Sequence, residues 1–497
     1  PQPPWPGVRT PPLWPSDTPY SRHMDGFHVP PRPDVPPEPR LIRINRPLAS
    51  EMGLSLDGLD NGQLAALFSG ETIPEGAEPL AQAYAGHQFG TFVPQLGDGR
   101  AVMLGEIITP DGRRFDMQLK GAGRTPFSRG GDGKAALGPV LREYLVSEAM
   151  AALGVPTTRA LAATLTGETI LRDRPLTGAV LCRIAASHIR VGTFQYFIAR
   201  GDTDRLRQLS DHVIARHYPA LAETAAPYEA LLEAVVEAQA ALVARWMGLG
   251  FVHGVMNTDN MTVSGETIDY GPCAFLDAYA GHARFSSIDQ NGRYAFGAQP
   301  HMALWNLTRL AECLLPLIDA DEEAAIARVT AILNRFPERF NWHWLAVMRA
   351  KTGLFEEREG DLALMQGLFA VMEGQGVDFT RFFRTLASDL AGQEQARDQF
   401  MDPTAFDPWR VQWATRMATE EGRVAERITL MNATNPRIIP RNHNIEAALE
   451  AAYAGDFTPF EALLEAVTHP FDTRPEWENY ATPPDDGGAG YVTFCGT

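Results

Sequence analysis

Apolar and polar positions between residues 101 and 120 predict a β-hairpin. Residues 101–108 are mostly apolar, residues 114–120 alternate between apolar and polar, and the Thr-Pro-Asp-Gly sequence at 109–112 is typical of a tight turn. Successive side chains of a strand point to opposite faces of a sheet. Lys120 is therefore expected to end the second strand on the face opposite Leu119, away from the apolar side.

Apolar residues spaced three or four apart predict helices in much of the remaining chain. A short helix is expected at 61–67, and a stronger pattern runs from Pro139 in its first turn to Gly154 past its end, which are residues typical of helix termini. A long amphipathic helix is expected at 228–248. The chain is thus expected to be α+β, with further helices at 301–318, 322–335, 361–373, 380–390, 445–454 and 459–467.

Both ends of the sequence have compositions that oppose regular structure. Residues 1–40 are crowded with proline, which removes backbone donors, so this segment is expected to wrap the surface without a core of its own. Residues 483–497 contain Pro-Pro, Asp-Asp and Gly-Gly pairs and are expected to be loosely ordered.

Length and charge limit the classes of function. At 497 residues the chain is expected to form two lobes or domains, and its net charge of -18 argues against nucleic acid or an anionic membrane as a partner. A phosphate-bearing ligand must then be bound by a local basic cluster. No apolar run reaches the roughly 20 residues of a membrane span. The expected compartment is the cytoplasm for a bacterial protein, or the mitochondrion for a eukaryotic one.

Cysteines and histidines give no metal signature. The four cysteines form no close pair, and Cys182 and Cys313 are expected to be small buried hydrophobic residues. The histidines at 253, 282, 301 and 443 lack the spacing of a zinc site on a helix and are expected to be structural.

The segment from His253 to Asn260, followed by Asp269-Tyr270-Gly271, has the spacing of a protein-kinase catalytic loop. In that pattern an aspartate two residues after the histidine accepts the substrate proton, while the asparagine and the later aspartate hold magnesium. Here the proton-accepting position is Val255, which cannot accept a proton. Asp259, directly before Asn260, is the candidate replacement.

Glycine-rich segments before the catalytic loop suggest phosphate contacts. Gly97 and Gly99 suit a tight turn whose amides could approach a phosphate, although an ordinary hairpin turn is the commoner explanation of such a pair taken alone. Residues 121–134 form a glycine-rich loop with three basic residues, which is typical of phosphate binding; a merely mobile loop is the alternative.

Charged residues near these segments complete a kinase-like series. The helix at 139–154 carries Glu143, which by its order is the better partner for Lys120, and Glu148 as the second choice. Arg183 and Arg190 suit phosphate oxygens, although surface ion pairs explain most arginines.

These stretches closely resemble the selenoprotein O family of pseudokinase-like enzymes, which transfer AMP from ATP to protein hydroxyl groups; the chain looks like a bacterial, cysteine-containing member. The likeness lies in residues 84–90, 94–106, 118–133, 142–150, 253–272 and 292–300, and is weaker at 435–443. It implies a bilobal protein-kinase-like fold with a small β-rich N-lobe and a larger helical C-lobe. The implied divisions are an N-terminal extension at 1–79, the N-lobe at 80–190, the C-lobe at 191–400 and a C-terminal extension at 401–497.

The resemblance also implies the roles of individual residues. ATP would lie flipped relative to ordinary kinases, with Mg²⁺, or Mn²⁺ as an alternative, held by Asn260 and Asp269. Asp259 would accept the proton of a Ser, Thr or Tyr hydroxyl, and Glu143 would hold Lys120. The implied nucleotide contacts are Gly97, Gly99, Arg100, Lys120, Asp132, Gly133, Arg183, Arg190 and Asp269.

Regulation and partners are implied in the same way. A terminal Cys495 would pair with Cys273, four residues after Asp269, and place the active site under redox control. The implied partners are ATP and proteins with hydroxyl side chains, redox-homeostasis proteins among them, acted on by a monomer. The chain departs from the family at Gly138-Pro139-Val140, where an Arg-Ser-Ser is common, which leaves nucleotide preference and rate open.

Three rival functions remain at this point. Conventional phosphotransfer conflicts with Val255 in the place of the catalytic aspartate. A silent nucleotide-binding scaffold would have no need of Lys120, Glu143, Asn260 and Asp269 together. UMP transfer from UTP is a third alternative that the sequence leaves open.

Overall fold

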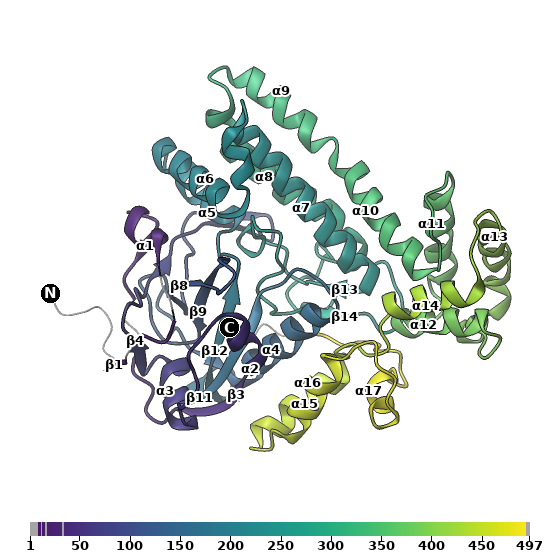
Figure 1. Cartoon of the computed structure of the whole chain (residues 1–497), viewed down its shortest axis with the longest axis horizontal. Helices are drawn as coiled ribbons and strands as arrows, with labels where there is room; N and C mark the ends of the chain where they lie inside the picture. Colours follow the sequence, from purple (N-terminus) through teal and green to yellow (C-terminus); the bar gives the residue numbers. More distant parts are fainter. Residues whose placement is uncertain (1–7, 11, 15–16, 32–33, 494–497) are drawn as a thin grey trace.

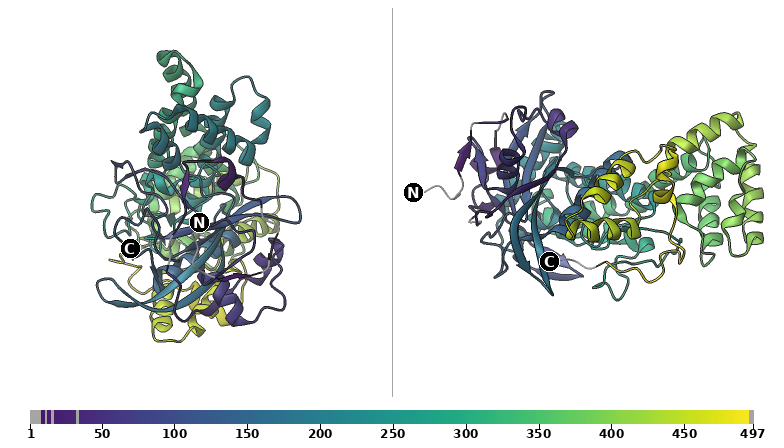
Figure 2. Two further views of the ribbon diagram at one scale, coloured as in Figure 1. Left: turned by 90° about the vertical axis from the view of Figure 1, so that its left-hand side faces the viewer. Right: turned by 90° about the horizontal axis from the view of Figure 1, so that it is seen from below.

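The computed structural model describes residues 8–10, 12–14, 17–31 and 34–493. It shows a mixed α/β fold with a β-sheet at one end of an elongated molecule and helices over the rest (Figures 1 and 2). None of the described helices is long and apolar enough to span a membrane.

The main sheet is antiparallel, with the strand order β3-β11-β12-β9-β8 and the short β10 paired with β12. The predicted hairpin at 101–120 is confirmed: it forms β8 and β9, with Ala101 opposite Lys120 and Ile108 opposite Arg114. The strands are β3 (Arg40–Ile44), β8 (Ala101–Ile108), β9 (Arg114–Lys120), β10 (Ala135–Ala136), β11 (Arg159–Leu171) and β12 (Pro175–Ala185).

Each face of this sheet is covered by a helix. Helix α3 (Asn61–Ser69) packs on one face, where Leu119 and Phe68 are buried in one hydrophobic cluster. Helix α4 (Leu137–Ala152) packs on the other face, where Leu181 and Leu141 belong to a second cluster. The alternation along β9 thus sends its apolar residues to α3 and leaves Lys120 on the side of α4, as predicted.

The N-terminal segment contributes to this core, which corrects the expectation that it only wraps the surface. Strand β3 pairs with β11 as an edge strand of the sheet, and Trp14, Leu48 and Ile73 are buried with the sheet residues. The physical reason is that the α3 face of the sheet is apolar and must be covered. A boundary at residue 79 therefore does not separate the sheet from the preceding chain.

Short strand pairs and helices flank the sheet. Two of the pairs border the site described below, namely β6–β7 and β13–β14. These elements are α1 (Pro19–His23), α2 (Arg46–Glu51), β1 (Val8–Thr10) with β4 (Thr72–Pro74), β2 (His28–Val29) with β5 (Ala81–Gln82), β6 (Gly86–Gln88) with β7 (Thr91–Val93), and β13 (Phe251–Val252) with β14 (Ala274–Phe275).

The remainder is helical. Figure 1 shows its long helices lying beside one another, and a smaller bundle of α11 to α14 at the end of the molecule away from the sheet. Every helix predicted from periodicity is present, with ends shifted by a few residues. The helices are α5 (Val191–Ile198), α6 (Thr203–His217), α7 (Pro227–Leu249), α8 (Gln299–Ile318), α9 (Glu322–Leu333), α10 (Phe336–Lys351), α11 (Asp361–Met372), α12 (Phe379–Leu390), α13 (Asp407–Met417), α14 (Val424–Thr434), α15 (Asn442–Tyr453), α16 (Thr458–Val467) and α17 (Glu478–Ala481).

The C-terminal segment returns to the sheet end and fixes α4. Helices α15 and α16 both pack on α4, and the Tyr453 hydroxyl accepts a hydrogen bond from the Gly138 amide at 2.9 Å. The tail continues to Thr493, which is buried and donates to the Pro272 carbonyl at 2.9 Å. The expectation of a loosely ordered tail is therefore wrong as far as Thr493.

Candidate active site

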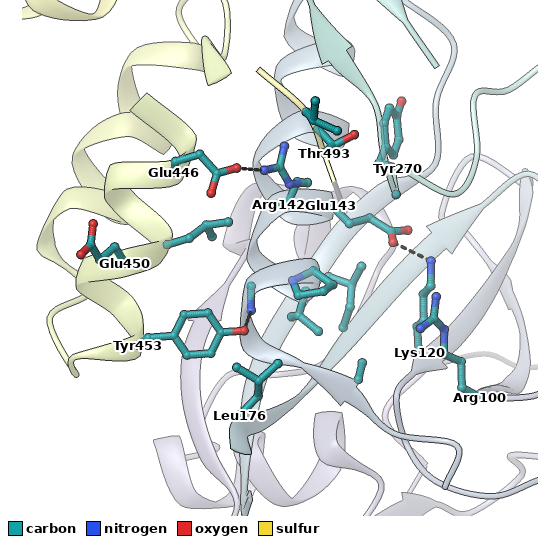
Figure 3. A pocket seen from close by; sticks show the side chains of 18 of the residues that line it. Arg100, Lys120, Arg142, Glu143, Leu176, Tyr270, Glu446, Glu450, Tyr453 and Thr493 are labelled. Atoms are coloured by element: carbon teal, nitrogen blue, oxygen red, sulfur yellow. Dashed lines mark hydrogen bonds and ion pairs between the residues drawn. The ribbon is translucent and has the colours of Figure 1, made fainter. Parts of the chain in front are cut away.

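The strand lysine and the helix glutamate meet as the sequence predicts. Lys120 Nζ, at the end of β9, lies 2.7 Å from Glu143 Oε2 on α4 (Figure 3). Glu148, the second choice, instead accepts two hydrogen bonds from Arg159, both at 2.9 Å, and ties α4 to β11. Five residues along α4 thus separate a glutamate that faces the site from one that supports the lobe.

The Asp269 carboxylate contacts three cationic side chains. Its Oδ1 accepts hydrogen bonds from Lys120 at 3.0 Å and from Arg183 at 2.7 Å, and its Oδ2 accepts one from Arg190 at 3.1 Å. Burial alone would raise the pKa of Asp269, but these cations, Lys120 foremost, hold it well below its usual value. We call Lys120, Arg183, Arg190, Glu143 and Asp269 the basic cluster; the arginines are buried partners of Asp269, not surface ion pairs.

The backbone of Asp269 is strained. Its φ of 61° lies in the left-handed region, which residues other than glycine rarely adopt and which costs roughly 1–3 kcal/mol. Such strain persists where surrounding contacts determine the conformation, and the three ion pairs of the carboxylate do so here. The direction of this carboxylate is therefore fixed by the fold.

His253 links the catalytic loop to the segment that carries Asp269. It is fully buried, its Nε2 lies 2.8 Å from the Ile268 carbonyl oxygen, and its ring stacks on Trp246 with centroids 5.5 Å apart. Burial lowers the pKa of His253, so the neutral ring can donate its Nε2 proton to that carbonyl. The histidine is therefore structural, as the sequence predicts.

Asp259 is buried with few partners. Gln88 donates to its Oδ2 at 3.3 Å, while its Oδ1 has no hydrogen-bond partner among the described residues. Gly86 leaves the room for this carboxylate, since a Cβ at that position would collide with Oδ1. Burial raises the pKa of Asp259 to about 6, although the nearby Arg190 opposes the rise. A carboxylate with this pKa can accept a proton near neutral pH.

Asp259 also contacts the basic cluster through its backbone. Arg190 donates to the Asp259 carbonyl at 2.9 Å and to Asp269 from the same nitrogen. Asn260 follows in the same 3-10 turn and donates its side-chain amide to the Val255 carbonyl at 3.0 Å. The candidate proton acceptor, Asn260 and the basic cluster thus form one site.

Asp98 belongs to the interior of this site, and sequence analysis did not single it out. Asp98 is buried, and its carboxylate accepts hydrogen bonds from the backbone N–H of Gln82 at 2.9 Å and from the side chain of Gln118 at 3.4 Å. Burial raises the pKa of Asp98 to about 6. Its only local signal is its position between Gly97 and Gly99.

Four other predicted nucleotide-binding residues have local contacts that explain their positions. Asp132 is ion-paired with Arg172 at 2.8 Å. Gly97 and Gly99 pack against Phe127, so the close approach of the 121–134 loop already requires both glycines. Gly133 has a φ of 68° and approaches the Gly123 carbonyl, so it too is explained by packing.

A cavity of about 720 Å³ opens beside the Lys120–Glu143 pair. This volume is in the range of ligand pockets in general. Figure 3 shows Lys120 and Glu143 at one side of the cavity and α15 at the other. Its charged and polar lining includes Arg100, Arg142, Arg174, Tyr270, Tyr491 and Thr493, the last two from the C-terminal tail.

The sequence predicts Asp269 and Asn260 as the metal ligands, and both carry hard oxygen atoms within this site. In the described part of the chain, no group of three or more His, Cys, Asp or Glu side chains could hold a metal ion by itself. Magnesium commonly binds one or two protein oxygens and completes its shell with substrate phosphates and water, so the donor set fits that ion.

Only one member of the predicted cysteine pair lies within the described residues. Cys273 is buried, while Cys495 lies outside the described residues, and the pairing stays a prediction. Cys182 and Cys313 are both buried, which confirms their predicted place in the interior.

Comparison with known proteins identifies the family. The family model for "Protein adenylyltransferase SelO" matches residues 17–468. Similar proteins named "Protein nucleotidyltransferase YdiU" occur in Methylorubrum populi, 55% identical over 98% of this chain and 99% of that protein, and in Bradyrhizobium diazoefficiens, 56% identical over 96% and 98%. Another, from Cereibacter sphaeroides, is 57% identical over 97% and 99%. The chain therefore belongs to the SelO family of protein nucleotidyltransferases.

Proposed function

We propose that this enzyme transfers AMP from ATP to a Ser, Thr or Tyr hydroxyl of an acceptor protein, with Asp259 as the proton acceptor. The hydroxyl oxygen attacks the α-phosphorus, the bond from this phosphorus to the bridging oxygen breaks, and pyrophosphate leaves. The hydroxyl proton goes to Asp259. The observation that carries this role is the buried carboxylate of Asp259, which has an unpartnered Oδ1 and a raised pKa. It lies in a loop where Val255 occupies the position of the proton-accepting aspartate of protein kinases.

The basic cluster is proposed to bind the distal phosphates of ATP. Lys120, Arg183 and Arg190 converge on Asp269, so three positive charges lie within reach of one anionic group. Arg190 also contacts the backbone of Asp259. If the distal phosphates occupy this cluster, the α-phosphorus of a flipped ATP faces Asp259. Arg100, beside Lys120 in the cavity wall, and Gly97, Gly99, Asp132 and Gly133 are the remaining proposed nucleotide contacts.

Asp269 and Asn260 are proposed to hold Mg²⁺, with Mn²⁺ as the alternative. Both present hard oxygen atoms, and the low pKa of Asp269 keeps its carboxylate ionised. A bound divalent ion would neutralise charge on the phosphates. Asp269 must exchange cation partners when metal and nucleotide bind, and the arginines are then available to phosphate oxygens.

The overall architecture is proposed to be a bilobal, protein-kinase-like fold. Support comes from the antiparallel sheet carrying Lys120, the adjacent helix carrying Glu143, and the loop at 253–260 between long helices. The N-lobe would then end near residue 190 and the C-lobe near residue 400, with the C-terminal extension docked on α4. A monomer and a redox-sensitive Cys273–Cys495 pair complete the proposal.

The test uses ATP labelled in parallel on the α- and the γ-phosphate, with Mg²⁺ and an acceptor mixture of bacterial proteins. Transfer of the α label alone is expected. Transfer of the γ label would mean phosphotransfer, and retention of bound ATP without any transfer would indicate a scaffold. α-Labelled UTP, run beside ATP, distinguishes UMP transfer, and the Asp259→Asn variant is the matched control.

A further inference from the structure

A cluster of two arginines on one tryptophan lies outside the proposed nucleotide site. The guanidinium carbons of Arg293 and Arg309 are each 4.8 Å from the centroid of the Trp305 ring. Arg293 precedes α8, whereas Trp305 and Arg309 lie on it. We call these three residues the arginine–tryptophan cluster. It holds two like charges together in a protein whose net charge is -18, which favours an anionic ligand.

Arg293 forms no ion pair with a carboxylate in the described part of the chain, and its guanidinium lies over the rings of Tyr294 and Trp305. Its Nε and Nη2 are buried and make no hydrogen bond to the described residues. Asp289, four residues earlier, is already occupied, because its carboxylate accepts the backbone amides of Arg293 and Tyr294, each at 2.8 Å. Buried donors without acceptors are costly, so they are expected where a ligand supplies the acceptor.

Arg309 is only partly satisfied. It is ion-paired with Glu312 at 2.7 Å, yet its Nε is also buried without a partner. The nearby His87 ring packs 5.2 Å from Trp305, and its pKa is lowered by burial first and then by the charges of Arg309 and Arg293, which favours a neutral ring. The cluster therefore contains buried cationic donors, from two segments of the chain, that have no acceptor among the described residues.

The cluster is connected to Asp259 by the β6–β7 hairpin. Gln88, at the end of β6, donates to Asp259 Oδ2, and two residues later Gly90 lies against Arg293, whose Cζ would be 3.4 Å from a Cβ at Gly90. The same region is tied together by Asn257, whose Oδ1 accepts hydrogen bonds from the Phe89 amide at 3.0 Å and the Tyr294 hydroxyl at 2.7 Å. Asp259 thus has the basic cluster on its backbone side and the hairpin with Arg293 on its carboxylate side.

We propose that the arginine–tryptophan cluster binds a carboxylate side chain of the acceptor protein, close to the hydroxyl that receives AMP. The inference rests on the proposed function and adds a substrate class: acceptor segments with Asp or Glu near the modified residue. An arginine fork matches a carboxylate with two parallel hydrogen bonds. The distal phosphates already have three cations in the basic cluster, so a second basic site beside Asp259 is assigned to the acceptor. Phe92 on the same hairpin is 37% exposed and offers an apolar contact to it.

The test compares the wild type with Arg293→Glu, and uses Arg284→Glu as a control with the same change of charge. Arg284 is exposed and lies in the same segment, and its side chain donates a hydrogen bond to the Asp289 carbonyl at 2.9 Å. Each protein is incubated with bacterial proteins and α-labelled ATP, and the modified residues are mapped by mass spectrometry. Peptides copied from a mapped site, with Glu, Gln or Lys in the flanking position, then give KM for peptide and for ATP.

The wild type and Arg284→Glu are expected to modify sites enriched in flanking Asp and Glu. Arg293→Glu is expected to raise KM for the Glu peptide about tenfold or more, to favour the Lys peptide, and to leave KM for ATP unchanged. A merely structural arginine would not reverse the charge preference. Labelled sites without acidic enrichment, or the same peptide preference in all three proteins, would overturn this inference alone. The absence of α label on every protein would remove the proposed function and this inference with it.

Discussion

The segments around Asp259 and Asp269 place the same residue type, only ten positions apart, in opposite surroundings. Asp269 meets three cations, which hold its pKa low, whereas the side chain of Asp259 meets one neutral amide and burial raises its pKa to about 6. One carboxylate therefore stays ionised and suits a metal or phosphate site, while the other can exchange a proton near neutral pH. The surroundings of each aspartate, and not the residue type, therefore determine which role its carboxylate can take.

Asp269→Ala is expected to have the largest effect. It removes the proposed metal ligand and leaves Lys120, Arg183 and Arg190 without their shared carboxylate, so ATP binding and AMP transfer should both be impaired. With several kcal/mol of charge stabilisation lost, kcat/KM is expected to fall by roughly 10⁴-fold. Calorimetric titration with ATP and Mg²⁺ gives the affinity, and α-label transfer gives the rate. If Asp269→Ala bound ATP with the affinity of the wild type, Asp269 would not have the metal and phosphate role that distinguishes it from Asp259.

Asp259→Asn is expected to reduce kcat by ~10²–10⁴-fold, the range for a general base. The amide keeps the shape and the contact with Gln88 but cannot accept a proton. ATP affinity should equal that of the wild type in the same titration. If Asp259→Asn and Asp269→Ala lose ATP binding equally, the division of roles between the two carboxylates is wrong.

Two glutamates on one helix give a smaller and more specific test. Glu143→Gln should raise KM for ATP by about tenfold, because Lys120 loses its charged partner. Glu148→Gln, the matched control, weakens the ion pair with Arg159 and should lower the free energy of unfolding by about 2 kcal/mol without changing KM for ATP. Equal effects of the two variants on KM for ATP would contradict the assignment of Glu143.

Glu266, between the two aspartates in sequence, is expected to affect stability and its pH dependence, with the smallest effect on AMP transfer. Burial raises its pKa to about 8, so the folded protein keeps a proton that the unfolded chain loses above its ordinary value near 4.5. Stability should therefore fall as pH rises from 5 to 8, by about 3–4 kcal/mol. Glu266→Gln should remove this slope in denaturant unfolding. An identical slope in both proteins would show that Glu266 ionises normally.

Local signals account for what the sequence predicted correctly. The β8–β9 hairpin has a turn sequence between two apolar segments, α4 has its terminal proline and glycine, and the 253–271 motif is contiguous. Strands β11 and β12 were not predicted, because their alanines and glycines interrupt the strand-favouring residues and weaken the pattern, while burial between α3 and α4 stabilises the strands.

The convergence of the site could be only partly predicted. The pairing of Lys120 with Glu143 follows from the order of kinase-like elements. Arg183 and Arg190 meet Asp269 across 86 and 79 residues of chain, and no local pattern reports such contacts. Asp98 was missed for the same reason, since its burial depends on the packing of the 121–134 loop over it.

The pH dependence of AMP transfer by the wild type tests the central claim most directly. Because Asp259 accepts a proton only when ionised, kcat should rise with pH through an apparent pKa of about 6 and level off above pH 7. Asp98 has a similarly raised pKa, so Asp98→Asn is the control and should keep the inflection. A kcat that is flat between pH 5 and 7.5, or an inflection that disappears in Asp98→Asn, would contradict the assignment of Asp259 as proton acceptor.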